Sequence, residues 1–273
     1  MNTSHATDDQ RDSILARYKK DGFCFPVGEV PLSLVSGAAQ NIDALLTSPP
    51  EQLAHPWTLK AHLLFDWIYE LTIHPSVLDA VEAVIGPNLL MQAADIFAKP
   101  GNSIKHVNWH QDANYWNLEP FEVCTAWIAL TDVFPKNGCM RFLPGTHTNQ
   151  KLEHNETFAD DSALTRGREI ALDIDENKAV PVILCAGQIS LHHCLFAHAS
   201  GPNSTESTRI VRYMSTHVRQ TNGPPMCAIL VRGSDDFGHF PADDPPTGDM
   251  NESAIQSHAR AMQPHASENY STA

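Results

Sequence analysis

The pattern of residue types along the chain changes at residue 88, and this change constrains the fold more than any other feature of the sequence. From residue 88 to residue 232 the sequence consists of short runs rich in β-branched and aromatic residues, separated by Gly, Pro and Asn; examples are VCTAWIALTDVF, VPVILCAGQISLHH and RIVRYMSTHV. Many short strands with turn residues between them predict a sandwich or a barrel. This part of the chain is therefore expected to be mainly β.

The part before residue 88 follows a helical pattern instead. Residues 8–20, 32–46 and 59–85 carry apolar side chains at the spacing of an amphipathic helix. His74 and Pro75 interrupt the last of these segments, and Gly86 and Pro87 end it. We expect these segments to be helical and to flank the β structure.

The 273 residues are compatible with one large domain, because β barrels of 200 to 250 residues often form single units. We expect a single domain, residues 1–273, with a mainly helical region (8–86), a β core (88–232), a polar insert (149–178) and a polar tail (241–273). The insert is too long for a plain hairpin, so it is interpreted either as a lid or as a disordered segment. The tail contains one short helical stretch, residues 254–262.

The charge balance excludes several classes of partner. The chain has 18 Lys and Arg against 32 Asp and Glu, a formal net charge of −14. Such a field repels phosphate backbones and anionic lipid, so we expect neither a nucleic acid nor a membrane partner. The chain has no apolar run of the roughly 18 to 20 residues that cross a bilayer, and its first residues do not resemble a signal peptide. A cytoplasmic location is expected.

A short motif, His110-Gln111-Asp112, is the strongest local candidate for chemistry. On a strand, residues i and i+2 point to the same face and can bind one metal ion together. With 15 histidines, however, about one such triplet is expected by chance. A similar triplet, His154-Asn155-Glu156, lies in the charged insert and is interpreted as part of a solvated loop.

A third ligand would complete the two-histidine, one-carboxylate face that non-haem Fe(II) oxygenases use. The segment SLHHCLFAHAS offers His192, His193 and His198. At about 3.3 Å per residue, His192 and His198 would lie roughly 20 Å apart on an extended strand, so we expect at most one end of this run to reach a given metal. The spacing alone does not choose between them, and each could equally be a buried core or edge residue.

Arg209 favours His198 as the third ligand. The turn-rich segment SGPNSTEST follows His198 and would fold the next strand back alongside, bringing Arg209 towards the metal. A cation within an apolar strand needs an anionic partner, and a dicarboxylate co-substrate held by two hydrogen bonds is one. An ordinary salt bridge to an acidic side chain is the alternative.

Three blocks of the sequence carry a resemblance to a known family. They are WHQD followed by YW, then TAWIALTDVFPKNGCMRFLPGTH, then HASGPNSTESTR. In this order they resemble the phytanoyl-CoA dioxygenase family of Fe(II)- and 2-oxoglutarate-dependent oxygenases, over roughly residues 10–240. The resemblance implies a double-stranded β-helix, a jelly-roll or cupin-like core, with helices packed outside one sheet.

The resemblance also implies roles for individual residues. The implied iron ligands are His110, Asp112 and His198, and the implied co-substrates are 2-oxoglutarate and O2. The implied 2-oxoglutarate-binding residues are Arg209, Ser200, Trp127, Gln92 and Lys60, although Trp127 could also be an ordinary core aromatic.

The activity that the resemblance implies is hydroxylation of an aliphatic C–H bond with release of succinate and CO2. Asp112 is retained, whereas halogenating relatives replace this carboxylate by Ala, so hydroxylation is favoured. Asn114, Tyr115 and Trp116 are interpreted either as a substrate pocket wall or as strand-end packing. The acidic balance favours a small free metabolite as substrate. The alternatives are a desaturase, epimerase or halogenase with the same site, and a non-catalytic jelly-roll module that binds a metal.

Overall fold

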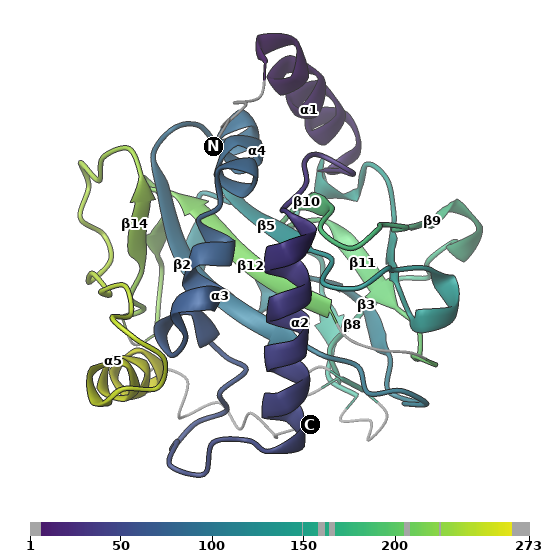
Figure 1. Ribbon diagram of the computed structural model, residues 1–273. Helices are drawn as coiled ribbons and strands as arrows, with labels where there is room; N and C mark the ends of the chain where they lie inside the picture. The colour runs from purple at the N-terminus through teal and green to yellow at the C-terminus, as the bar shows by residue number, and fades with distance from the viewer. Residues whose placement is uncertain are drawn as a thin grey trace.

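A computed structural model describes residues 7–148, 150–157, 162–163, 167–204, 208–223 and 225–263, with residues 208–212 described by their backbone alone. Its centre is a pair of antiparallel sheets (Figure 1). The larger sheet has the strand order β1 (Phe23–Cys24), β10 (Ile189–His193), β5 (Val123–Ile128), β12 (Thr208–Ser215), β2 (Leu89–Phe97) and β14 (Ile229–Arg232). The smaller sheet has the order β3 (Val107–Gln111), β11 (Ala197–Ser200), β6 (Met140–Phe142) and β9 (Val180–Pro181).

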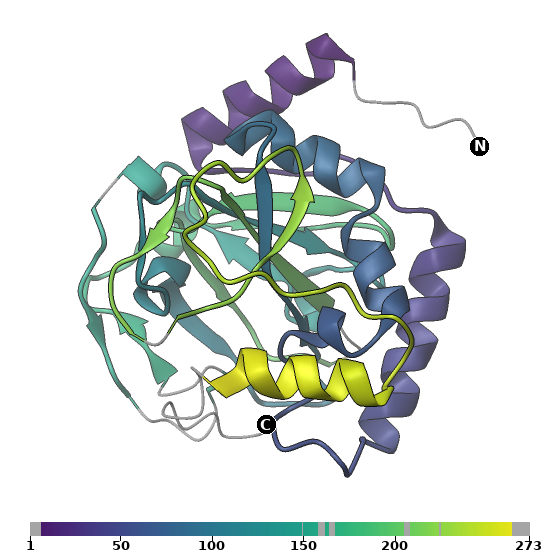
Figure 2. The same cartoon turned by 90° about the vertical axis from the view of Figure 1, so that its left-hand side faces the viewer.

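Helices cover one face of the larger sheet, as the sequence predicts. They are α1 (Asp8–Asp21), α2 (Leu32–Thr47), α3 (Asp66–Thr72) and α4 (Pro75–Ile85), with α5 (Glu252–Met262) near the end of the chain. In Figure 1 the helices α2, α3 and α4 lie in front of the strands, and the turned view of Figure 2 separates this layer from the sheets. The expected fold class, mainly β with flanking helices on a double-stranded β-helix, is confirmed.

The helix boundaries follow local signals. Thr7 caps α1 in a capping box with Gln10, and Gly22 ends it in the left-handed conformation with φ of 85°. The segment 59–85 is interrupted at His74 and Pro75, as the sequence predicts, because Pro75 cannot donate a backbone hydrogen bond and instead starts α4 at its first position. Only a 3-10 turn, η1 (Ala61–Leu63), and α3 precede this proline in the segment.

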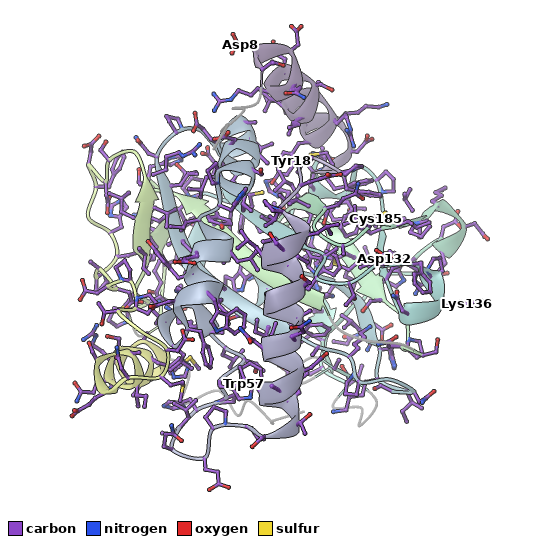
Figure 3. All side chains as sticks on the ribbon, viewed as in Figure 1. Asp8, Tyr18, Trp57, Asp132, Lys136 and Cys185 are labelled. Carbon is purple, nitrogen blue, oxygen red and sulfur yellow. The ribbon has the colours of Figure 1, made fainter. Side chains whose placement is uncertain are left out.

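The main hydrophobic core lies between the helices and the larger sheet. Side chains from α1, α2, α3 and α4 pack there against residues of β2, β5 and β10 that alternate along each strand. In Figure 3, Asp8 lies at the outer end of α1 while Tyr18 lies at its inner end, where it is 5% exposed. The other residues of these strands therefore face the smaller sheet.

The insert contributes further structure where it is described. A two-stranded ladder joins β7 (His154–Asn155) to β8 (Glu169–Ile170). The backbone N–H of Gln111 in β3 donates to Nε2 of His154 at 3.0 Å. The described part of this insert is thus folded against the β core, and His154 is not part of a solvated loop. No helix in the described ranges is long and apolar enough to cross a membrane.

Candidate metal centre

Three side chains converge between the two sheets. His110 lies in β3, Asp112 starts the short 3-10 turn η2 (Asp112–Asn114) directly after this strand, and His198 lies in β11. The antiparallel register places His198 opposite His110, so residues 88 positions apart in sequence become neighbours. The ligand atoms of the three side chains lie within 4.8 Å of one another.

The two oxygens of Asp112 have different surroundings. Oδ1 lies 3.5 Å from Nε2 of His110 and 3.6 Å from Nε2 of His198. Transition metals bind such nitrogen and oxygen atoms at about 2 Å, so Oδ1 of Asp112 lies close enough to each of the two nitrogens to share one ion with it. The side chains of both histidines are buried, whereas that of Asp112 is 16% exposed. The cluster is therefore open at the carboxylate.

Backbone carbonyls orient both imidazoles. Nδ1 of His110 lies 2.9 Å from the carbonyl of Asn108, and Nδ1 of His198 lies 3.1 Å from that of Phe196. An Nδ1–H donating to each carbonyl leaves the Nε2 lone pair directed at Asp112 and at the other histidine. This is the arrangement that metal-ligating histidines show in proteins.

The electrostatics favour the protonation states that a metal needs. Burial raises the pKa of Asp112, but the neighbouring His198 and the contacts with His110 and His192 outweigh burial and hold its pKa well below the ordinary value. Burial, together with His110, lowers the pKa of His198 well below its ordinary value, and Asp112 opposes this only partly. An ionised carboxylate and a neutral imidazole are the forms that coordinate metal ions.

His192 and His193 occupy different places from His198. The chain turns between β10 and β11, so the ring centroids of His192 and His198 are only 4.8 Å apart, and the separation expected for one extended strand was wrong. Of the two, His198 belongs to the cluster whose ligand atoms lie within 4.8 Å of one another. Nε2 of His192 lies 3.5 Å from Oδ2 of Asp112. His193 instead accepts a hydrogen bond from the backbone N–H of Leu195 at 3.1 Å, and burial lowers its pKa to about 4.

Ser200 has a cationic partner that sequence reasoning missed. Nζ of Lys99 donates to Oγ of Ser200 and to the carbonyl of Gly201, both at 2.6 Å. Lys99 is 6% exposed, and burial lowers its pKa to about 8. No acidic side chain among the described residues pairs with it. A lysine directly after an apolar strand, as in IFAKP, is the sequence signal that could have identified it.

The remaining residues predicted for 2-oxoglutarate are placed as follows. Trp127 is 2% exposed and packs in the cluster that contains Phe142 and Phe196. Arg209 lies in β12 opposite Ile96 and Ile128, and its side chain lies outside the described part of the structure.

Lys60 and Gln92 make their contacts with the C-terminal part of the chain. Nζ of Lys60 donates to the carbonyl of Cys227 at 3.0 Å and lies 3.4 Å from Oδ2 of the buried Asp243. Nε2 of Gln92 lies 3.6 Å from the sulfur of Met226. The charge of Lys60 therefore has an anionic partner within the protein, and binding of 2-oxoglutarate by Lys60 and Gln92 stays a prediction.

Two of the three predicted substrate residues border the ligands. The ring of Tyr115 lies 6.0 Å from that of His110, and the guanidinium of Arg168 lies over it at 5.0 Å. Asn114 Nδ2 lies 3.3 Å from Nε2 of His154. Trp116 packs instead against an apolar cluster that includes residues of β4 (Leu118–Glu119), β5 and β12.

The two sheets and the histidine–carboxylate cluster between them define the scaffold of the non-haem iron oxygenases. The family model of phytanoyl-CoA dioxygenase (PhyH) matches residues 18–211. The chain therefore belongs to the phytanoyl-CoA dioxygenase (PhyH) family, and the predicted resemblance is confirmed.

Named relatives agree with this family. The human peroxisomal phytanoyl-CoA dioxygenase is 31% identical over 140 residues, covering 50% of this chain and 41% of the relative. A probable alpha-ketoglutarate-dependent hypophosphite dioxygenase of Stutzerimonas stutzeri is 32% identical over 153 residues, covering 54% of this chain and 52% of the relative. The chain thus spans about half the length of the curated relatives it matches.

A solved structure matches nearly the whole chain. The apo form of the non-heme monooxygenase ThoJ superposes with a TM-score of 0.81 at 34% identity, covering 93% of this chain and 96% of ThoJ. Both the fold and the order of the elements are therefore shared over almost the full length of the two proteins.

Proposed function

We propose that the protein is an Fe(II)- and 2-oxoglutarate-dependent oxygenase that hydroxylates an aliphatic C–H bond of a small metabolite and releases succinate and CO2. The observation that carries this proposal is the convergence of Nε2 of His110, Oδ1 of Asp112 and Nε2 of His198 in one partly open cluster. Three protein ligands on one side leave the other side of an octahedral ion for 2-oxoglutarate and O2.

The protein and the metal have separate tasks in this proposal. Fe(II), when bound, supplies the activation of O2 at the expense of 2-oxoglutarate. The chain supplies the two oriented imidazoles and the ionised carboxylate that hold the ion, and buried walls that exclude water. The presence of Asp112 favours hydroxylation over chlorination, because halogenating relatives lack this carboxylate.

Lys99 and Ser200 are the proposed site for the distal carboxylate of 2-oxoglutarate. Ser200 is two residues beyond His198 on β11, a distance of about 7 Å along a strand, which suits a five-carbon dicarboxylate chelating the metal at its other end. Lys99 brings a buried positive charge to Ser200 at 2.6 Å without an acidic partner among the described residues. A carboxylate bound there would gain charge-assisted hydrogen bonds from Lys99 and Ser200.

The proposed substrate lies beside Tyr115, at the exposed side of Asp112. The insert reaches this position through Arg168, whose guanidinium lies over the Tyr115 ring and donates to the carbonyl of Asn114 at 2.6 Å. We propose that this wall contacts a small molecule and that the insert limits its size.

The test is anaerobic titration of the protein with Fe(II) and 2-oxoglutarate, followed by O2 and measurement of succinate. We expect a visible charge-transfer band before O2 and succinate after it, even without the true substrate. No band and no succinate with a broad substrate panel would contradict the proposal.

The matched controls are two histidine variants. His198→Ala is expected to lose Fe(II) binding, because a facial site with one imidazole removed binds the ion weakly. His258→Gln changes a buried histidine of α5 that contacts the carbonyl of Leu59 at 2.8 Å, and it should bind Fe(II) as the unchanged protein does.

A further inference from the structure

His192 is a fully buried imidazole that the proposed mechanism does not use. It is 1% exposed, and neither ring nitrogen has a hydrogen-bond partner among the described residues. Burying a polar group without a partner costs roughly 1–3 kcal/mol, so a phenyl ring would suit this position better unless the imidazole has a task. Its neighbours include Phe142, with ring centroids 5.4 Å apart, and Phe196, at 6.5 Å.

The metal-site carboxylate lies close to this imidazole. Nε2 of His192 lies 3.5 Å from Oδ2 of Asp112, at the outer limit of a hydrogen bond. Oγ1 of Thr125 donates to the same oxygen at 3.1 Å. His192 and Thr125 are paired in the register of β10 and β5, so they approach Asp112 side by side from the larger sheet.

The surroundings of Asp112 are therefore divided between its two oxygens. Oδ1 faces His110 and His198 of the smaller sheet, and Oδ2 faces His192 and Thr125 of the larger sheet. We propose that His192 is a positioning residue which, together with Thr125, holds Oδ2 and so makes Asp112 bind the metal through Oδ1 alone. This inference rests on the proposed metal site.

His192 differs from the two proposed ligands in how its ring is oriented. In His110 and His198 a backbone carbonyl accepts from Nδ1 and leaves Nε2 free for a metal. Nδ1 of His192 has no such carbonyl in the described structure. A neutral imidazole with its proton on Nε2 can therefore donate to Asp112, and nothing fixes the tautomer that a metal would require.

Binding through one oxygen of Asp112 determines how many positions on the metal ion stay open. With His110, His198 and one oxygen of Asp112, three positions of an octahedral ion stay open, two for 2-oxoglutarate and one for O2. If both oxygens of Asp112 were bound, only two positions would stay open, and co-substrate and O2 could not be held together. Two donors on Oδ2 disfavour that second mode.

The test is the affinity for Co(II), measured anaerobically by competition with a chromophoric chelator, together with the visible spectrum of the Co(II) protein. His192→Phe should still fold without metal, because the phenyl ring fits among the aromatic neighbours of His192, Phe142 and Phe196. We expect it to bind Co(II) about 10- to 100-fold more weakly, as variants of groups that support metal ligands do. Its absorption intensity should also change because the carboxylate is no longer restrained.

Two further variants separate positioning from other roles. His192→Gln keeps an N–H donor and should bind Co(II) within about threefold of the unchanged protein. Thr125→Val removes the other donor to Oδ2 and should weaken binding in the same direction as His192→Phe.

Several outcomes would overturn the inference. Unchanged Co(II) affinity and spectrum in His192→Phe would show that the imidazole has no such task. Loss of binding in both His192→Phe and His192→Gln, to the extent seen in His198→Ala, would make His192 a ligand instead. Co(II) affinity does not depend on turnover, so a protein that responds as expected but yields no succinate would contradict the proposed function and leave this inference supported.

Discussion

At the scale of single residues, the buried positive charge of Lys99 indicates a binding role for this side chain. Lys99 is 6% exposed, and its ammonium group contacts two neutral oxygens, those of Ser200 and Gly201. A buried cation of this kind is costly unless an anion joins it. The anion that we propose is the distal carboxylate of 2-oxoglutarate.

Replacing Lys99 by Met should weaken 2-oxoglutarate binding by about tenfold or more, because a charge-assisted hydrogen bond contributes roughly 1.5–3 kcal/mol. The measurement is the Kd from the charge-transfer band of the anaerobic Fe(II) complex. 2-Oxobutyrate keeps the chelating oxygens but lacks the distal carboxylate, so its Kd should stay unchanged in the same variant. Equal weakening for both ligands would show that Lys99 acts on the fold and not on the carboxylate, and Lys99→Arg should preserve most of the affinity.

At the scale of elements, the pairing of β12 bears on which of its two arginines, Arg209 or Arg212, lies on the face that meets the site. Arg209 and Arg212 are three residues apart and so lie on opposite faces of the strand. The register places Arg209 opposite Ile128 and Ile96, both of the core beneath the helices, and Arg212 opposite Thr125, whose hydroxyl contacts Asp112. The register thus adds Arg212 as an alternative on the face of Thr125, whereas Arg209 stays the arginine that the family resemblance implies.

We expect one of the two variants Arg209→Met and Arg212→Met to raise the Kd for 2-oxoglutarate by about tenfold or more and the other to leave it nearly unchanged, because only one face of β12 meets the site. The two variants lie in one strand and remove the same charge, so each is the control for the other. The Kd is again taken from the anaerobic Fe(II) complex. A larger effect of Arg209→Met would support the residue that the family resemblance implies, and a larger effect of Arg212→Met would support the residue that shares the face of Thr125. No effect of either variant would contradict both assignments.

The sequence alone does not determine which of the two arginines lies on the face of β12 that meets the site. The run RIVRYMST predicts a strand, and β12 occupies Thr208–Ser215. The alternation of apolar and charged residues along this run is ambiguous, however, because charged residues occur on both faces of the strand. Only the partners on β2 and β5 fix which face meets the smaller sheet.

At the scale of the whole molecule, buried neutral histidines make stability depend on pH. Burial lowers the pKa of His193 and of His258 from 6.5 to about 4. Between these values the unfolded chain binds more protons than the folded one, so the free energy of unfolding rises with pH in this window. The stability that these two neutral histidines contribute is fully present above about pH 6.5 and is lost as the pH falls towards 4.

Each of these two histidines should cost on the order of 3 kcal/mol of stability by pH 4, from the size of its pKa shift. The measurement is urea unfolding of the chelator-treated protein at several values between pH 7 and pH 4.5. His258→Gln keeps a donor for the carbonyl of Leu59 but does not titrate, so its slope should be shallower. Identical slopes in the two proteins would contradict this assignment.

Local patterns in the sequence were sufficient for much of the architecture. Short-range patterns predicted the helices, the change to strands near residue 88 and the pair His110 and Asp112. Each of these depends on residues only a few positions apart, so it can be read from the sequence. The blocks of the family resemblance likewise carried the fold class.

The tertiary structure alone decided which distant residues meet at the site. His192 approaches Asp112 only because the chain turns between β10 and β11, and Lys99 reaches Ser200 only because the segment after β2 passes the end of β11. Strand register and turns determine these contacts, and both depend on how the two sheets bury their inner faces against each other. The physical reason is that periodicity identifies the faces of one element, whereas packing between elements selects the partner of each face.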